Sequence, residues 1–254
     1  MTGRVGVEHH LRIATDTTAI HLQFNRPEKR NALNRQTAVE LHDALERYVH
    51  DHRPLVLSSA TPGMFVAGAD VNELRSRTVD QTLTRTNARL FQKLADHPAP
   101  TVAVVEGWAL GGGFELALAC DLRLSTPDAS WGLPEVRLGI IPSGGALTRT
   151  RELIGASLAT DLVMTGRRID GSEAHRIGLV QRLTDSGELD GALNDLLEQL
   201  GAAPAHALAL AKEAMRVEGD RHRLVDAAAQ AICLADEETQ RRLAKLATDN
   251  RGQQ

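Results

Sequence analysis

Hydrophobic and polar residues alternate in one short segment near the start of the chain. Ile20, Leu22 and Phe24 are apolar, and His21 and Gln23 stand between them. This period of two is typical of a half-buried strand, and the segment LRIAT, across a polar turn, predicts a strand before it. Apolar runs in PLVLSS, TVAVVEG and LRLST predict three further strands.

A helical period follows the first strands. Asn34 is a good N-terminal cap, and Ala38, Leu41 and Leu45 recur at the spacing of one helix face. Residues 80–95 predict a second helix, which the segment HPAP ends. Helices and strands therefore alternate along this part of the chain.

The last third of the chain has a different pattern. After the loop-rich segment WGLPEVRLGIIPSGG we expect a helix from about Gly144, and from about Ser157 onward the pattern is almost wholly helical. Strands alternating with helices, followed by helices alone, indicate an α/β fold with a helical end. We expect a core in residues 1–200 and a C-terminal helical region in residues 201–254.

Composition narrows the function. The net charge of −4 offers no basic surplus for nucleic acid, and only 3% of residues are aromatic. Two cysteines are too few for a disulfide framework, so a reducing cytoplasm is expected. We find no signal-peptide core and no apolar run long enough to span a membrane. His50 and His52 lie at an expected helix end, where we expect them to face solvent, so no metal site is predicted.

The segment ALGGGFELALACD places three glycines between a strand and a helix. A dinucleotide site would need G-x-G-x-x-G, but Leu116 stands where the last glycine belongs. A phosphate-binding loop would need Lys-Ser or Lys-Thr after the glycines, and neither follows. Close packing of helix against strand is one remaining reading of the three glycines.

A second reading is that the bare backbone binds a carbonyl oxygen. N–H groups at a helix start are unpaired and carry the positive end of the helix dipole, so they can stabilise a developing oxyanion. Gly112 is the natural donor, and Glu115 follows about one turn later. A second donor is expected in FVAGAD, where Ala67, Gly68 and Ala69 are small enough for close approach.

A second carboxylate, Glu135, lies in WGLPEVRLGIIP beside Pro134 and apolar residues. Apolar surroundings should raise its pKa, which suits proton transfer near neutral pH. Considered alone, Glu135 would more often be a solvated loop charge.

Together these motifs resemble the crotonase family, the enoyl-CoA hydratase/isomerase superfamily. The resemblance covers residues 24–180 and rests on five stretches in this order: NRPEKRNALN, FVAGAD, ALGGGFELALACD, WGLPEVRLGIIP and TGRRIDGSEAHRIGLV. It implies a spiral of ββα turns with C-terminal helices that assemble trimers or dimers of trimers. It also implies an acyl-CoA thioester substrate, with no metal or redox cofactor.

The resemblance assigns roles to residues. Ala69 and Gly112 would form an oxyanion hole for the thioester carbonyl. Glu115 would mainly orient and activate water, and Glu135 would mainly deliver the proton. Contacts to the CoA ester would come from Lys29, Arg30, Ala32, Leu33, Ala67, Gly68, Asp70, Val71, Gly111 and Pro134.

Three features depart from the common family pattern. Asn72 stands where hydratases often carry a lysine that contacts phosphate. The tail DEETQRRLAKLATDNRGQQ lacks the aromatic residue that often covers a neighbour's CoA, and IPSGGALTRTRELIG differs from the commoner glycine-rich version. The phosphate contact, the lid and the acyl-pocket shape are therefore expected to differ.

Two glutamates at these positions are the pattern of hydratases in the family. The sequence thus predicts an enoyl-CoA hydratase, a lyase of fatty acid β-oxidation or related acyl-CoA catabolism. An enoyl-CoA isomerase, another crotonase chemistry and a non-catalytic acyl-CoA-binding protein are the alternatives. We expect residues 80–95 to set the acyl chain length. We also expect the C-terminal helices to form a homotrimer or homohexamer through apolar positions at helical spacing, namely Leu208, Ala211 and Met215, and Leu224, Ala228, Ile232 and Cys233.

Overall fold

The computed structural model describes residues 10–216 and 222–249. Its larger sheet has the strand order β1-β2-β3-β4-β6-β9. Only β1 is antiparallel to its neighbour, and the other strands run parallel. The strands of this sheet are β1 (Leu11–Thr15), β2 (Ile20–Phe24), β3 (Leu55–Ser59), β4 (Thr101–Val105), β6 (Leu122–Ser125) and β9 (Arg182–Leu183).

A smaller second layer explains the spiral. The three-stranded sheet has the order β5-β7-β8, formed by Trp108–Leu110, Ser130–Gly132 and Arg168–Asp170. Two isolated bridges, Leu33 with Ala69 and Val66 with Ala109, extend this layer. The chain passes from a strand of the larger sheet to an extended segment of the second layer and then into a helix. Leu33, Ala69 and Leu110 are therefore equivalent positions, each just before a helix.

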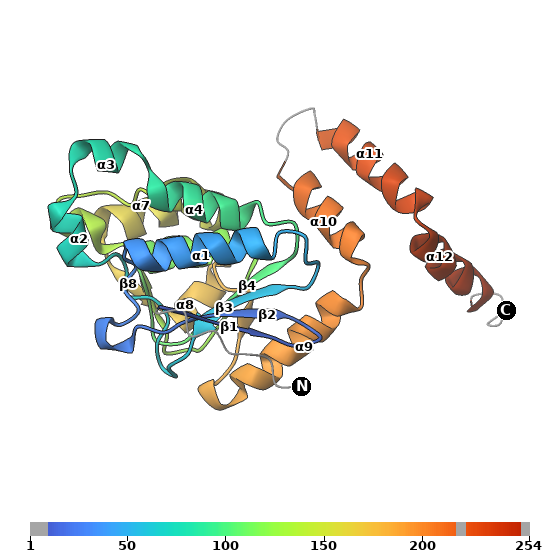
Figure 1. Ribbon diagram of the computed structural model, residues 1–254, viewed down its shortest axis with the longest axis horizontal. Helices are drawn as coiled ribbons and strands as arrows, with labels where there is room; N and C mark the ends of the chain where they lie inside the picture. Colours follow the sequence, from blue (N-terminus) through green and yellow to red (C-terminus); the bar gives the residue numbers. More distant parts are fainter. Residues whose placement is uncertain (1–9, 217–221, 250–254) are drawn as a thin grey trace.

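Helices cover both faces of the larger sheet (Figure 1). Leu55 and Leu57 of β3 belong to one apolar cluster with residues of α1, α4 and α5, whereas Val56 between them belongs to a second cluster with the leucines of α9. This alternation follows from the period of two in a strand. The helices are α1 (Arg35–Arg47), α2 (Val71–Ser76), α3 (Val79–Leu83), α4 (Thr86–Ala95), α5 (Gly112–Ala119), α6 (Ala146–Ile154), α7 (Ala156–Thr165), α8 (Gly171–Arg176) and α9 (Leu189–Gly201), with short 3-10 turns η1 (Pro27–Lys29), η2 (Pro134–Leu138) and η3 (Ser186–Glu188).

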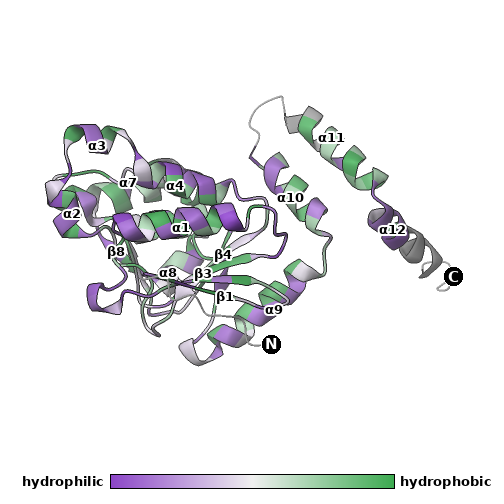
Figure 2. Ribbon diagram, in the orientation of Figure 1, coloured by the Kyte–Doolittle hydropathy of each residue, from purple (hydrophilic) through white to green (hydrophobic). Residues whose placement is uncertain are grey.

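The last three helices are α10 (Ala205–Ala214), α11 (His222–Ala235) and α12 (Glu237–Asp249). The helix α10 lies beside the core, and α11 and α12 extend away from it (Figure 1). The buried residue of α10 is Lys212, whose ammonium lies 2.6 Å from the Asp121 carboxylate and 3.2 Å from the Ala99 carbonyl oxygen. This ion pair fixes α10 to the core. Figure 2 shows hydrophobic residues interspersed with hydrophilic ones on α11, which lies away from the core.

The predicted strands and the first helix are confirmed, but two predicted segments are wrong in detail. Residues 80–95 form two helices, α3 and α4, because Arg85 between them has a left-handed backbone with φ of 53°. The chain after Ser157 is mostly helical, as predicted, but it also contains the short strands β8 and β9, which the prediction missed. Both strands are two or three residues long, too short to give a readable alternation.

Within the described ranges, no helix is long and apolar enough to cross a membrane. The same residues contain no group of three or more His, Cys, Asp and Glu side chains arranged to hold a metal ion.

Candidate active site

The three glycines at the start of α5 have three different physical roles. Gly111 has φ of 52°, and a Cβ there would lie 2.7 Å from Oε1 of Glu135. A Cβ at Gly113 would overlap the Val66 carbonyl oxygen, so this glycine permits close packing. A Cβ at Gly112 would make only ordinary contacts, 3.5 Å from Leu33 Cδ1 and 3.6 Å from Ala69 N. The packing reading thus holds for Gly113, and Gly112 faces the Ala69 amide.

Two backbone N–H groups at this point have no acceptor within residues 10–216 and 222–249. Ala69 N makes no hydrogen bond to the described part of the chain, because the bridge to Leu33 uses the Gly68 carbonyl and the Asp70 N–H instead. Gly112 N also lacks an acceptor among these residues, since it is the first residue of α5. The spiral therefore brings together two unpaired donors from segments about forty residues apart.

Glu115 lies one turn into α5 and is buried, with 5% of its surface exposed. Its Oε1 accepts hydrogen bonds from Gly144 N at 2.6 Å and Ala146 N at 3.2 Å, at the start of α6. A Cβ at Gly144 would lie 2.6 Å from Oε2 of Glu115, so this glycine gives the carboxylate space. Burial raises the pKa of Glu115, and these N–H groups and the charge of Arg149 oppose that rise.

Glu135 begins the 3-10 turn η2 and is half-buried. Its Oε2 is buried without a hydrogen-bond partner in the described residues. Burial, with a further contribution from the charge of Glu115, raises the pKa of Glu135 to about 7. Gly111 connects the two residues: its carbonyl accepts the Glu115 N–H at 2.9 Å, and the Glu135 carboxyl group lies against its Cα. Burial thus raises the pKa of both carboxyl groups, while N–H groups at the start of α6 and the charge of Arg149 oppose the rise at Glu115.

Comparison with known proteins shows the family to which this chain belongs. Residues 14–245 match the family model described as enoyl-CoA hydratase/isomerase. The chain belongs to the enoyl-CoA hydratase/isomerase family. Among its relatives is a probable mitochondrial enoyl-CoA hydratase 2 of Arabidopsis thaliana, 37% identical over 79% of this chain and 68% of that protein. The enoyl-CoA isomerase/hydratase claC of Penicillium crustosum is 43% identical over 64% of this chain and 19% of that protein.

The fold agrees with this family. The crystal structure of an enoyl-CoA hydratase from Bacillus anthracis superposes with a TM-score of 0.88 at 29% identity, and the match covers 96% of this chain and 97% of that one. The predicted crotonase-type ββα spiral with a helical C-terminal region is therefore confirmed.

Most of the predicted CoA contacts lie along one rim, which we define as residues 29–33 and 67–71 around the Leu33–Ala69 bridge. Lys29 and Arg30 are exposed, and the Arg30 guanidinium lies 5.1 Å from the centre of the Trp108 ring. The other predicted residues of the rim are Ala32, Leu33, Ala67, Gly68, Asp70 and Val71. Pro134 is separate from this rim, at the start of η2 and next to Glu135.

Arg26, next to this rim, is a structural residue that sequence reasoning missed. It donates to the Ala32 carbonyl at 3.0 Å and to Asp70 Oδ2 at 2.9 Å. Asp70 also caps α2 by accepting the Asn72 N–H at 3.0 Å. The carboxylate of Asp70 is thus engaged within the protein, and its backbone is engaged too, since its N–H donates to the Leu33 carbonyl at 2.8 Å and its carbonyl accepts the Leu74 N–H at 2.9 Å. Asp70 therefore holds the rim together, and a direct contact with CoA stays a prediction. An Arg-Pro pair before a predicted ligand loop could have drawn attention to this brace.

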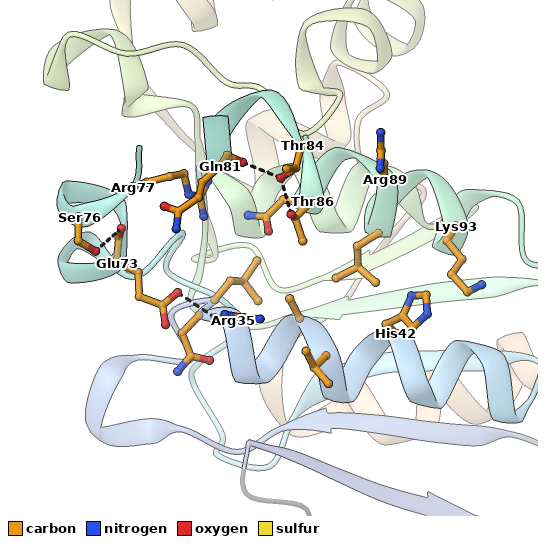
Figure 3. Close-up of a pocket in the computed structure, with 16 residues that line it drawn as sticks. Arg35, His42, Glu73, Ser76, Arg77, Gln81, Thr84, Thr86, Arg89 and Lys93 are labelled. Carbon is orange, nitrogen blue, oxygen red and sulfur yellow. Dashed lines mark hydrogen bonds between the residues drawn. The ribbon is translucent and has the colours of Figure 1, made fainter. Parts of the chain in front are cut away.

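A cavity of about 740 Å³ lies between α1 and the α2–α4 segment (Figure 3). Leu33 lines it, and Cδ1 of the same side chain lies near Gly112, so Leu33 separates the cavity from the two N–H groups, which are not part of its lining. Residues expected to set the acyl length, including Gln81, Asn87 and Leu90, form one wall. Whether this wall sets chain length stays a prediction. The remaining labelled lining residues include Arg35, His42, Glu73, Ser76, Arg77, Thr84, Thr86, Arg89 and Lys93.

Proposed function

We propose that this protein is an enoyl-CoA hydratase that adds water to a 2-trans-enoyl-CoA and forms a 3-hydroxyacyl-CoA. The supporting observation is the pairing of two carboxyl groups, Glu115 and Glu135, next to two unpaired backbone N–H groups. Hydration needs one group that activates water and one that donates a proton. The pKa of both carboxyl groups is raised by burial, but their surroundings differ. Glu115 accepts two backbone N–H groups, which favour its charged form, whereas Oε2 of Glu135 is buried without a hydrogen-bond partner in the described residues, which suits a proton donor.

The N–H groups of Ala69 and Gly112 form the oxyanion hole in this proposal. They bind the thioester carbonyl oxygen and stabilise the negative charge that develops when the 2,3-double bond is attacked. The helix dipole of α5 adds to this effect, because Gly112 is its first residue. The two hydrogen bonds are strongest in the transition state, where the thioester oxygen carries the most negative charge, so they lower the activation free energy.

The carboxyl groups then divide the work. Glu115 accepts a proton from water as the oxygen bonds to C3 of the acyl chain. Glu135 gives its proton to C2, so the electron pair of the double bond ends in the new C–H bond. Exchange with solvent returns both groups to their starting states. Neither step calls for a metal or a redox cofactor, so coenzyme A enters only as part of the substrate.

Isomerisation of the double bond is the second candidate. A named relative is an isomerase/hydratase, and one carboxylate that moves a proton between two carbons suffices for it. Mass spectrometry of the product separates the two reactions, since hydration adds the mass of one water and isomerisation adds none. We expect the hydrated product. A product of unchanged mass with a shifted double bond would favour isomerase activity.

Three further points belong to the same proposal. Binding without catalysis is disfavoured, because an unpartnered buried carboxyl oxygen costs free energy that simple retention of a ligand does not require. The enzyme is expected to act in fatty acid or related acyl-CoA catabolism. A cytoplasmic location stays a prediction from composition, and the Arabidopsis relative is named as mitochondrial.

A further inference from the structure

The side chain of Arg149 connects two elements behind Glu115. It extends from α6, and its Nη2 donates to Oε1 of Gln92 on α4 at 2.9 Å. Its Nη1 lies 3.4 Å from the Gly144 carbonyl oxygen. A Cβ at Gly145 would overlap this nitrogen, so the guanidinium packs directly against the 144–145 backbone. Arg149 therefore fastens the turn before α6 to α4.

The same turn holds Glu115. Gly144 donates its N–H to Oε1 of Glu115 at 2.6 Å, while its carbonyl faces Arg149. A single glycine thus lies between the guanidinium and the carboxylate. The positive charge also lowers the pKa of Glu115 against the opposing effect of burial. A shift of the turn would move both the hydrogen bonds and the charge.

We propose that Arg149 is the positioning residue for Glu115, holding the Gly144 turn against Gln92 and so keeping the Glu115 carboxylate in place. This inference rests on the proposed function, in which Glu115 activates water. Arg149 does not touch the reacting atoms in this account. It acts through the N–H groups of Gly144 and Ala146 and through its charge.

Other charged groups face this assembly and set its electrostatic background. Glu152 on α6 and Asp96 after α4 attract the Arg149 charge, and Arg216 after α10 opposes it. Glu135 is the other carboxyl group whose charge couples to Glu115. All four remain in place when only Arg149 is changed. A change in titration can therefore be assigned to Arg149.

The test compares Arg149→Met, Arg149→Lys and Gln92→Met with the unmodified protein. Arg149→Met should lower kcat roughly tenfold or more with little change in KM, because a misplaced catalytic group loses rate. It should also move the acid limb of kcat/KM to higher pH by roughly one unit, since a cation near the carboxylate is lost. Arg149→Lys keeps the charge and should restore the acid limb. Gln92→Met should lower kcat with a smaller shift.

Arg151→Met is the matched control, because Arg151 is an exposed arginine on the same helix. It should leave both kcat and the pH profile unchanged. A folded Arg149→Met protein with an unshifted acid limb would overturn the proposal, as would Arg149→Lys behaving like Arg149→Met.

The ionisation of Glu115 can also be followed without turnover. A ¹³C titration of labelled glutamate carboxyls, assigned with Glu115→Gln, should show a higher pKa for Glu115 in Arg149→Met. If the unmodified protein hydrates no enoyl-CoA, the proposed function fails but this titration still tests Arg149. An unchanged Glu115 titration would contradict the inference even in an active hydratase.

Discussion

At the scale of single residues, the sequence motifs predicted the candidate catalytic groups but not the contacts that hold their side chains in position. Ala69, Gly112, Glu115 and Glu135 could be named from short sequence patterns. In the structure Gly112 lies against the Ala69 amide, Glu135 lies against Gly111, and the charge of Glu115 acts on Glu135, while their roles stay predictions. The contacts of Glu115 with Gly144 and Ala146 come from about thirty residues further along the chain. The spacing of residues within one motif cannot predict such a contact, because it depends on how α6 packs against α5.

The raised pKa of Glu135 predicts a stability effect. The native state keeps the proton up to about pH 7, whereas a free glutamate loses it near 4.5, so stability falls as the pH rises between these values. Glu135→Gln has no carboxyl group to ionise, so the part of the fall in stability that comes from Glu135 should disappear. We expect the variant to be more stable than the unmodified protein at pH 8 by about 1–2 kcal/mol, allowing for solvent screening.

Denaturant unfolding at pH 5 and pH 8 measures this difference. The gain should shrink toward pH 5, where both states of the unmodified protein bind the proton more fully. A gain that is equal at the two pH values would show that Glu135 is not the group responsible.

Gly112→Pro tests the oxyanion hole. Proline has no N–H, and the first position of a helix tolerates it, so α5 should form. Loss of one donor costs about 2.7–4 kcal/mol of transition-state stabilisation, or roughly 10²–10³ in kcat. Steady-state kinetics measure kcat, and a thermal melt shows whether the variant is folded. Full activity in a folded variant would show that the Gly112 N–H is not an oxyanion donor.

At the scale of elements, close approach matters more than propensity. Gly113 lies against the Val66 carbonyl oxygen, so Gly113→Ala should destabilise the protein by about 1–3 kcal/mol although alanine favours helices. Gly191, inside α9, has no neighbour within 4 Å of an added Cβ. Gly191→Ala is thus the control and should stabilise by about 0.5–1 kcal/mol. Equal effects of the two changes on the melting temperature would refute the packing role.

The element boundaries show where sequence patterns stop being informative. The alternation in β2 and the stripe of α1 predict both elements because one face of each is buried. Met215, just after α10, is 82% exposed, as expected of an apolar position left for a partner, but the buried residue of α10 is Lys212, which the pattern does not single out. Its burial depends on Asp121, ninety residues earlier, which periodicity cannot reveal.

At the scale of the whole molecule, the extended helices predict assembly. Met215 and Ile232 are more than half exposed, Ala211 and Ala228 are exposed, and the side chain of Leu224 lies outside the described residues. A second copy would cover such surface under closed symmetry. Light scattering at micromolar concentration should give three or six times 27.5 kDa. A monomer with full activity would contradict this expectation.

The central claim is hydration by Glu115 and Glu135, and one assay tests it most directly. The absorbance of the conjugated enoyl thioester is followed after addition of the unmodified protein, Glu115→Gln or Glu135→Gln, with short, medium and long 2-trans-enoyl-CoAs. The unmodified protein should consume at least one substrate, and each variant should be roughly 10²–10⁴-fold slower while still binding the CoA ester. Near-normal kcat in either variant, or tight binding without turnover by the unmodified protein, would contradict the account.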